Sequence, residues 1–277
     1  MRSGRPHKGR VTGRRRWRGK LLLLSLLCGI LYFAEGRYGN FRLRGIEVTP
    51  GVLPEEIVWQ SVPQDADNFW PLLLWNQRSL AKKIEGFYPV EMRLRLVGWG
   101  RYFIELKPLE AYIYVSWNSR MWLLSTNGRM WLASLPANTQ VRGVGHPTRP
   151  ILSWDSGLAL PIDPERQMGD IYPSSLPLQK IKGWYETAEK IGWYGDIYCL
   201  LAKKVDGKPV VQILLGGVEA ITGEIIVPES TANWLPLAAA LEELFPNGEY
   251  LKPPGMIVNA TYSDMKFTVT EKGPKRP

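Results

Sequence analysis

The amino-acid sequence predicts an α+β protein with three parts. These are an N-terminal transmembrane helix, a small domain in the order strand, helix, helix, strand, strand, and a mainly antiparallel β domain with flanking helices. An uncharged apolar run behind a basic N-terminus predicts the first part. Helical and strand periodicity over residues 41–108 predicts the second. Hairpin signals at Asn127-Gly128 and Asp206-Gly207 predict the third.

The N-terminal segment joins positive charge to an apolar run. Residues 1–20 contain nine basic residues and no acid. Those nearest the apolar run are Arg14, Arg15, Arg16, Arg18 and Lys20. The run that follows predicts a transmembrane anchor at 21–36. Its fourteen uncharged residues would extend about 21 Å as a helix, so flanking side chains must help to cover a hydrocarbon core of roughly 30 Å. The excess of Lys and Arg predicts that residues 1–20 form a basic cytoplasmic tail.

A cleaved signal peptide is the alternative interpretation of this segment. The length of the apolar run fits one, and Ala34-Glu35-Gly36 resembles a cleavage site. The long and unusually basic leader favours retention as an anchor. Both interpretations predict that residues 37–277 are exported.

The rest of the chain is balanced in charge. Nine of the 35 basic residues lie in the first twenty positions, so 26 remain beside 26 acidic residues. A nucleic-acid-binding domain would carry a basic excess, which this part lacks. Cys28 lies in the apolar run and Cys199 in a predicted strand, so we expect no disulfide. Two Cys and two His also offer no metal cluster.

Residues 41–108 are predicted to form one small domain. A strand at 41–48 would contain a glycine bulge at Gly45. Pro54-Glu55-Glu56 opens a short helix. A second helix follows Asn76, with Phe87 on its buried face and Gly86 just beyond its end. Two strands at 90–96 and 101–107 complete the domain.

Residues 109–270 are predicted to form the β domain, followed by a disordered tail at 271–277. The expected elements are a strand at 111–117, a hairpin at 121–135 with a type I′ turn, loops with short strands at 136–176, a helix at 178–191, a hairpin at 199–217 and a helix over 237–245.

The last part of the β domain switches the face that it buries. Up to residue 262 the apolar or aromatic residues stand at even-numbered positions, namely Met256, Val258, Ala260 and Tyr262. From residue 267 they stand at odd-numbered positions, namely Phe267 and Val269. Successive side chains of a strand point to opposite faces, so one uninterrupted strand cannot bury both sets. A bulge or a turn is therefore expected at 263–265.

The order of these parts resembles that of the FtsQ/DivIB family of bacterial cell-division proteins, in which a basic tail and one span precede a POTRA domain and a β domain. The segments that carry the resemblance are FRLRGIEVTPGVLPEEI (41–57), SLAKKIEGFYPVEMRLRLVG (79–98), RYFIELKPLEAYIYV (101–115), MWLLSTNGRMW (121–131), VVQILLGG (210–217) and MIVNATYSDMKFTV (256–269). The sequence departs from the family pattern at Pro50-Gly51, Asn259, Thr261 and Met265.

The resemblance implies a non-catalytic scaffold in the cell (inner) membrane at the division septum. Such a scaffold links early and late division proteins and septal peptidoglycan synthesis. The implied partners are FtsL-like and FtsB/DivIC-like single-span coiled-coil proteins, the septal peptidoglycan synthase complex and membrane lipid. A partner segment would add as an extra strand at the terminal strand of the β domain. Carried over to this sequence, the contact residues are Tyr262, Asp264, Lys266 and Phe267. Core packing is the alternative for Tyr262 and Phe267.

Residues that an enzyme would need are sparse, so we expect no catalytic activity, cofactor or metal. His146, in a Gly/Pro loop, is the only imidazole of the part predicted to be exported. Residues 65–68 begin like a calcium loop but lack its glycine and distal glutamate. Two alternatives stay open. One is a membrane-anchored cell-wall enzyme that uses carboxylates such as Asp155 or Asp163, and the other is a POTRA-bearing transport or assembly component.

Overall fold

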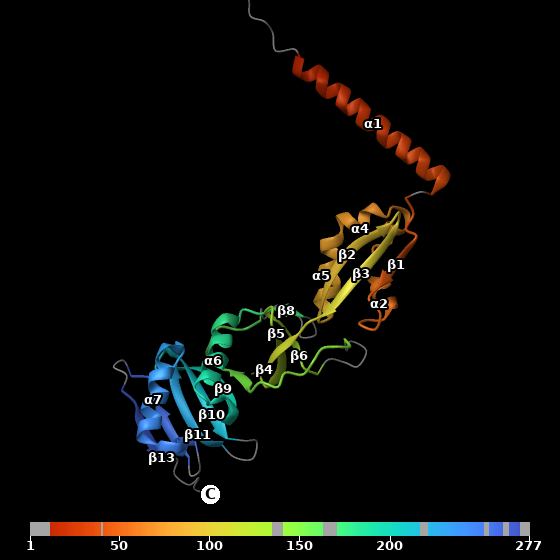
Figure 1. Cartoon of the computed structure of the whole chain (residues 1–277). Coiled ribbons are helices and arrows are strands. Elements are labelled where there is room, and N and C mark those ends of the chain that lie inside the picture. The colour runs from red at the N-terminus through yellow and green to blue at the C-terminus, as the bar shows by residue number, and fades with distance from the viewer. Residues whose placement is uncertain are drawn as a thin grey trace, which may run out of the picture. The chain divides into compact units, whose positions relative to one another are not determined.

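A computed structural model gives a mixed α+β fold with one small and one large sheet (Figure 1). It describes residues 12–39, 41–134, 141–162, 171–216, 221–251, 255–262 and 266–271. The chain divides into two compact units. The first holds the described residues of Met1–Thr49, Glu55–Leu80 and Arg93–Glu105, and the second those of Pro50–Pro54, Ala81–Met92 and Leu106–Pro277. The expected domain boundary at 108/109 stays a prediction.

Helix α1, Thr12–Tyr38, contains the segment expected as an anchor. It begins inside the basic tail and not at residue 21, because Arg and Lys favour a helix and do not end one. Its side chains are described from Lys20 to Phe33, and all of them are exposed. Among the helices whose side chains the structure describes, none is long and apolar enough to cross a membrane.

Three strands form the small sheet in the order β1 (Gly45–Val48), β3 (Arg101–Pro108), β2 (Val90–Gly98). Strand β1 is parallel to β3. It begins at Gly45 and is therefore shorter than the expected strand at 41–48. Leu43 lies before it, and its N–H donates to the carbonyl of Asp67 (3.0 Å) and not to a strand, so no bulge at Gly45 is needed. Gly100 closes the β2–β3 turn with φ +69°, and a Cβ there would lie 2.8 Å from the carbonyl oxygen of Arg42. This position therefore requires glycine.

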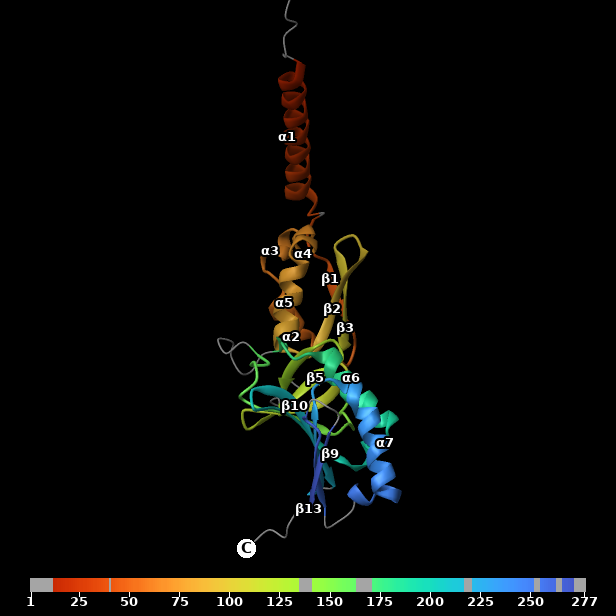
Figure 2. The same cartoon turned by 90° about the vertical axis from the view of Figure 1, so that its left-hand side faces the viewer.

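Four helices lie on one side of the small sheet (Figure 2). They are α2 (Glu55–Ser61), α3 (Asp65–Asn68), α4 (Pro71–Trp75) and α5 (Gln77–Phe87). Helices α3 and α4 were not expected, and residues 65–68, which begin like a calcium loop in sequence, form the helical turn α3. In α5, Leu80 and Ile84 are buried. The helix ends later than predicted, since Gly86 lies inside it, and the terminal Phe87 is exposed.

Ten strands form the large sheet in the order β13-β12-β11-β10-β9-β7-β4-β5-β6-β8. Their bounds are β4 Ala111–Trp117, β5 Arg120–Ser125, β6 Arg129–Leu132, β7 Ile151–Trp154, β8 Tyr172–Pro173, β9 Ile197–Val205, β10 Lys208–Gly216, β11 Ile221–Pro228, β12 Met256–Asn259 and β13 Thr268–Glu271. Strand β7 runs parallel to β4 and β9, and β11 runs parallel to β12. The other pairs are antiparallel. Strand β11 was missed, and β13 extends to Glu271, one residue into the expected tail.

Two helices, α6 (Leu178–Lys190) and α7 (Trp234–Leu244), lie on one side of the large sheet (Figure 2). Short 3-10 segments are η2 (Tyr194–Asp196), η3 (Thr231–Asn233) and η4 (Pro246–Leu251). Side chains such as Ile181, Trp184 and Leu241 join the main core with residues of the sheet. A second buried cluster contains Leu109, Leu123, Trp131 and Ile171. Strand β5 contributes to both clusters, which explains why Trp122, Leu123 and Leu124 are buried in succession.

The hairpin turns differ from one another in their backbone. At 206–207 both Asp206 and Gly207 have positive φ, and Val205 pairs with Lys208, which confirms the predicted two-residue turn. The type I′ turn predicted at Asn127-Gly128 is wrong, because only Gly128 has positive φ and the loop contains three residues, 126–128. A two-residue turn with positive φ at both positions is found instead at 118–119.

Candidate partner-binding edge

Strand β13 forms one end of the large sheet. It pairs with β12 on one side, and no other described strand lies against its second side. Thr268, Thr270 and Glu271 are exposed. A free strand edge presents backbone N–H and C=O groups that another strand can pair with. The edge of β13 is therefore a candidate site for an added strand.

The chain reverses its direction before it forms this edge. Strands β12 and β13 are antiparallel, with Val258 opposite Val269, so the turn that was one of the two expected explanations is confirmed. The proposed turn residues, 263–265, lie outside the described residues, and so does the predicted contact residue Asp264. The side-chain oxygen of Asn259 accepts hydrogen bonds from Thr261 N (3.1 Å) and Oγ1 (2.8 Å). This local turn directs the chain away from β12.

A small apolar groove lies beside the reversal. Its cavity measures about 150 Å³. The lining residues are Asn233, Pro236, Leu237 and Ala240 from η3 and α7, and Ala260, Tyr262 and Phe267 from the segments next to β12 and β13. Cavities that hold small-molecule ligands measure roughly 300–1,000 Å³. This groove is smaller and suits a single apolar side chain.

The structure gives different environments to the sequence-predicted contact residues. Tyr262 is 51% exposed, so it is not a core residue. Phe267 is partly buried and packs against the main core, as its alternative interpretation expected, yet it also lines the groove. Lys266 is exposed between them. Two of the four predicted residues therefore meet at one apolar groove.

The contribution of α7 to this groove was missed by the sequence reasoning. Leu237 was expected only as part of a helical core stripe. Asn233, Pro236 and Ala240 follow one helical face at intervals of three and four residues. The apolar pair Pro236 and Ala240, four residues apart beside the core stripe, was the available signal, but nothing in the sequence indicates that the terminal segment packs next to it.

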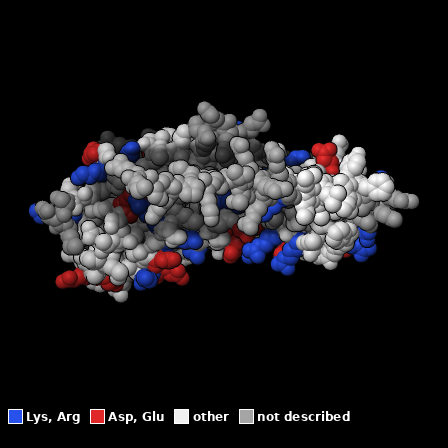
Figure 3. Space-filling view, turned by 90° about the horizontal axis from the view of Figure 1, so that it is seen from above, with Lys and Arg blue, Asp and Glu red and all other residues white. Residues whose placement is uncertain are grey.

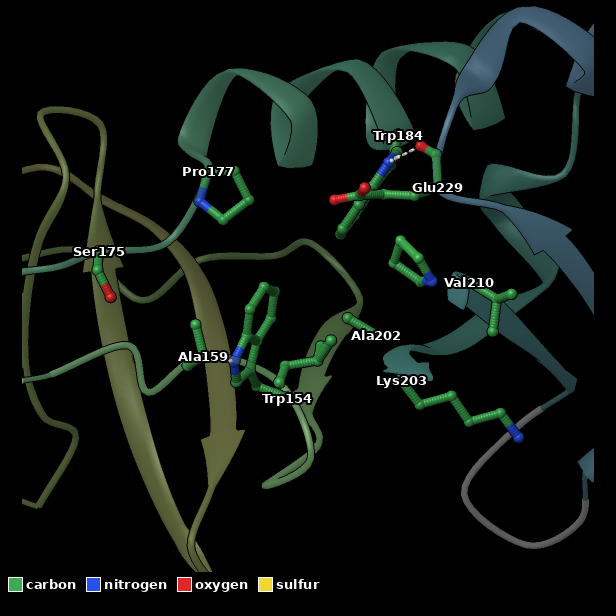
Figure 4. Close-up of a pocket in the computed structure, with 11 residues that line it drawn as sticks. Trp154, Ala159, Ser175, Pro177, Trp184, Ala202, Lys203, Val210 and Glu229 are labelled. Carbon is green, nitrogen blue, oxygen red and sulfur yellow. Dashed lines mark hydrogen bonds between the residues drawn. The ribbon is translucent and has the colours of Figure 1, made fainter. Parts of the chain in front are cut away.

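A second pocket, of about 190 Å³, lies between α6 and the sheet (Figure 4). Trp154, Trp184 and Pro177 form apolar walls, and Lys203 points away from the two indoles. Trp184 Nε1 donates to the carbonyl oxygen of Glu229 at 2.8 Å. The hydroxyl of Ser175, which also lines this pocket, donates to the carbonyl oxygen of Leu160.

His146 is engaged in a structural contact. Its Nδ1 lies 2.6 Å from the hydroxyl of Tyr114, and the two rings stack. In the same surface pocket Arg149 lies over the ring of Tyr112, 4.6 Å from its centroid. Desolvation by burial raises the pKa of Tyr112, with the charge of Arg149 opposing that shift. These contacts hold the loop against the sheet, and Glu110 lines the same pocket.

Of the two carboxylates considered for a cell-wall enzyme, the structure describes Asp155. Asp155 accepts a hydrogen bond from Gly157 N (3.0 Å) and so stabilises a turn, whereas Asp163 lies outside the described residues. No group of three or more metal-ligating side chains is found in the described part of the chain. Neither cysteine forms a disulfide bond. Burial raises the pKa of the Cys199 thiol, which disfavours a reactive thiolate.

On the described part of the face that Figure 3 shows, Lys and Arg side chains are interspersed with Asp and Glu. This agrees with the balanced composition beyond residue 20. Comparison of the chain with models of protein families gives no match, and comparison with curated proteins gives none either.

Proposed function

We propose that this chain is a non-catalytic scaffold of bacterial cell division that holds its partners by strand addition at β13. The observation that carries the proposal is the free edge of β13 beside the apolar groove at Tyr262 and Phe267. The partners are FtsL-like and FtsB/DivIC-like coiled-coil proteins, and through them the septal peptidoglycan synthase complex. The resemblance to the FtsQ/DivIB family supports this assignment.

Strand addition divides recognition between backbone and side chains. The backbone groups of β13 would pair with a partner strand whatever its sequence, so side chains along this edge can vary. Alternate side chains of the added strand point to the same face, and one of them would enter the groove. A cavity of about 150 Å³ accommodates an aliphatic or aromatic side chain, so we expect one apolar anchor residue in the partner.

The proposal also places the apolar part of α1, residues 21–36, in the cell membrane, with residues 1–20 in the cytoplasm and the β domain on the opposite side of the membrane. The exposed leucines of α1 support this placement, because an apolar helix surface is stable when lipid or protein covers it. The short apolar run requires bilayer thinning or contributions from flanking residues. A reporter enzyme that is active only outside the cytoplasm should be active when fused to residue 277. Activity only of a cytoplasmic reporter at that position would contradict the orientation.

Replacement of a groove residue by a charged one tests the proposed contact. Tyr262→Lys should abolish co-purification of the coiled-coil partners from native membranes, because it brings a charge to a contact that excludes water. Leu235→Lys is the matched control, since Leu235 is an exposed residue of α7 (56%) outside the groove. Equal partner recovery with both variants would contradict the proposal.

Proline substitutions in β13 test strand addition itself. In a strand, neighbouring N–H groups point to opposite sides, so one of Val269 and Thr270 directs its N–H to β12 and the other to the free edge. Val269→Pro and Thr270→Pro should therefore differ. One should loosen β13, and the other should remain folded but lose partner binding. If both folded variants bind like the parent chain, partners do not pair with this edge.

A further inference from the structure

Aromatic side chains of the first compact unit form a continuous and partly exposed cluster. Trp75 is next to Phe69 (6.0 Å between ring centroids), Phe69 is next to Phe41 (5.4 Å), and Phe41 is next to Trp99 (5.7 Å). Trp70 is buried beneath them, with its ring 5.3 Å from Trp99. Trp75 is 73% exposed and Trp99 is 54% exposed. Large aromatic side chains rarely gather at a surface unless something covers them.

The turn between β2 and β3 extends this apolar surface. Val97 is 56% exposed, and Leu96 is also exposed at the end of β2. Trp99 lies between Gly98 and Gly100 in the same turn. Backbone hydrogen bonds connect the segments that carry the rings, from Trp70 N to Phe41 O (2.8 Å) and from Arg44 N to Gly100 O (2.7 Å). The exposed residues are therefore held together by the fold.

Positive charge borders the cluster. Arg42, Arg44 and Arg101 are exposed on the two segments that carry Phe41 and Trp99, and residues 96–101 and 41–44 contain no acid. Asp65 and Asp67 are exposed on the neighbouring α3. Tryptophan together with arginine is the combination found at the membrane–water interface, where indoles lie at headgroup depth and cations meet anionic lipids.

Chain connectivity favours lipid over a protein as the occupant. Helix α1 ends at Tyr38, only three residues before Phe41. Three residues span at most about 11 Å, so the cluster cannot lie far from the outer end of this helix. We propose that the cluster of Phe41, Phe69, Trp75 and Trp99, with the tip residue Val97, docks on the interface of a phospholipid bilayer. This docking rests on the membrane placement of α1 in the proposed function, but not on strand addition at β13.

A fluorescent probe at the turn tests the docking in the full chain. Cys28→Ser and Cys199→Ala remove the native thiols, and Val97→Cys then carries an environment-sensitive fluorophore. Glu56→Cys, exposed on α2 of the same unit, carries the control probe. The labelled chains are reconstituted into vesicles of phosphatidylcholine and phosphatidylglycerol that contain spin-labelled lipid. We expect a blue shift at position 97 and several-fold stronger quenching there than at position 56. Omission of phosphatidylglycerol should weaken the quenching.

Substitution of the two most exposed indoles identifies the cluster as the cause. Trp75→Gln with Trp99→Gln should reduce quenching at position 97 to the level at position 56, while the chain keeps its circular dichroism spectrum. Equal quenching at 97 and 56 in a chain that floats with the vesicles would overturn docking and leave the anchor intact. A chain that does not float would overturn both. A response at 97 that requires added membrane proteins would assign the cluster to a protein partner. None of these outcomes affects the pull-down through β13, which tests the scaffold separately.

Discussion

The two ends of the large sheet treat their free edges in opposite ways. At one end β8 has only two residues, Tyr172 and Pro173, and Pro173 has no N–H to offer a further strand. At the other end β13 has four residues without proline, three of them exposed, and it borders an apolar groove. Proteins commonly protect free edges by shortness and proline. The contrast indicates that β8 is closed to pairing, whereas β13 keeps the features that an added strand needs.

The two ends are also held in place by different means. Strand β6, beside β8, is fixed by the side chain of Arg129. Its guanidinium lies 3.0 Å from the carboxylate of Glu85 and donates to Val90 O at 3.1 Å. Strand β12, beside β13, depends on close backbone approach at Gly255, where φ is +93°. The end of the sheet at β8, called the closed end, is therefore stabilised by polar side chains. The end at β13, called the open end, is stabilised by backbone packing that leaves its outer edge free.

The largest loss of stability from a single substitution is expected at the open end. In Gly255→Ala the new Cβ would overlap the carbonyl of Thr222, and the backbone would remain in a left-handed conformation. We expect the free energy of unfolding to fall by on the order of 3 kcal/mol, with the effect concentrated in β12 and β13. Partner binding should be lost as well. Gly207→Ala is the control, since Gly207 also has positive φ but a Cβ at that position would meet no atom within 4 Å; its cost should be about 1 kcal/mol. Hydrogen exchange of the β12 and β13 amides measures the loss of stability in each of the two variants. Similar losses in both would contradict the close backbone packing at Gly255.

An intermediate effect is expected at the closed end. Arg129→Met removes the cation from Glu85, whose carboxylate is mostly buried and also accepts a hydrogen bond from Met92 N (2.8 Å). The expected cost is about 2 kcal/mol, because a buried carboxylate is left without its cation. Lys180→Met removes an ion pair to Glu229 of similar length (3.1 Å) from a largely exposed lysine and should cost less than about 0.5 kcal/mol. Urea unfolding monitored by hydrogen exchange in β6 distinguishes the two. Equal costs would mean that Arg129 contributes little beyond a surface pair.

Local signals predicted much of the fold, and contacts between distant segments account for the rest. Alternation and turn residues predicted β3, β4 and the β9–β10 hairpin, since Asp206-Gly207 suits positive φ without help from elsewhere. The same reasoning failed at Asn127-Gly128, because Ser125 Oγ accepts from Arg129 N (2.9 Å) and donates to Arg129 O (3.0 Å), interactions that accompany a three-residue loop. At the candidate site, parity predicted either a bulge or a turn before β13, and the structure shows the turn. It could not predict that α7 would form the other wall of the groove.

The smallest of the three effects concerns η4, which leads into the open end. Tyr250 is buried there, and its hydroxyl accepts a hydrogen bond from Trp193 Nε1 at 2.9 Å. Tyr250→Phe leaves that indole N–H without its acceptor, so stability near neutral pH should fall by about 1 kcal/mol.

The difference in stability between the parent chain and the Tyr250→Phe variant should also depend on pH. Desolvation by burial raises the pKa of Tyr250, and the hydrogen bond from Trp193 partly opposes that shift. The folded state then keeps the proton above the ordinary tyrosine pKa of about 10, whereas the unfolded state loses it. Unfolding therefore releases a proton in that range, and the contribution of Tyr250 is complete below pH of about 10 and lost as the pH rises through the folded pKa. Because the Phe variant has no phenol to ionise, the stability gap between the two chains should narrow above this pH in thermal unfolding. A gap that is constant with pH would show that the Tyr250 hydroxyl ionises equally in the folded and unfolded chains.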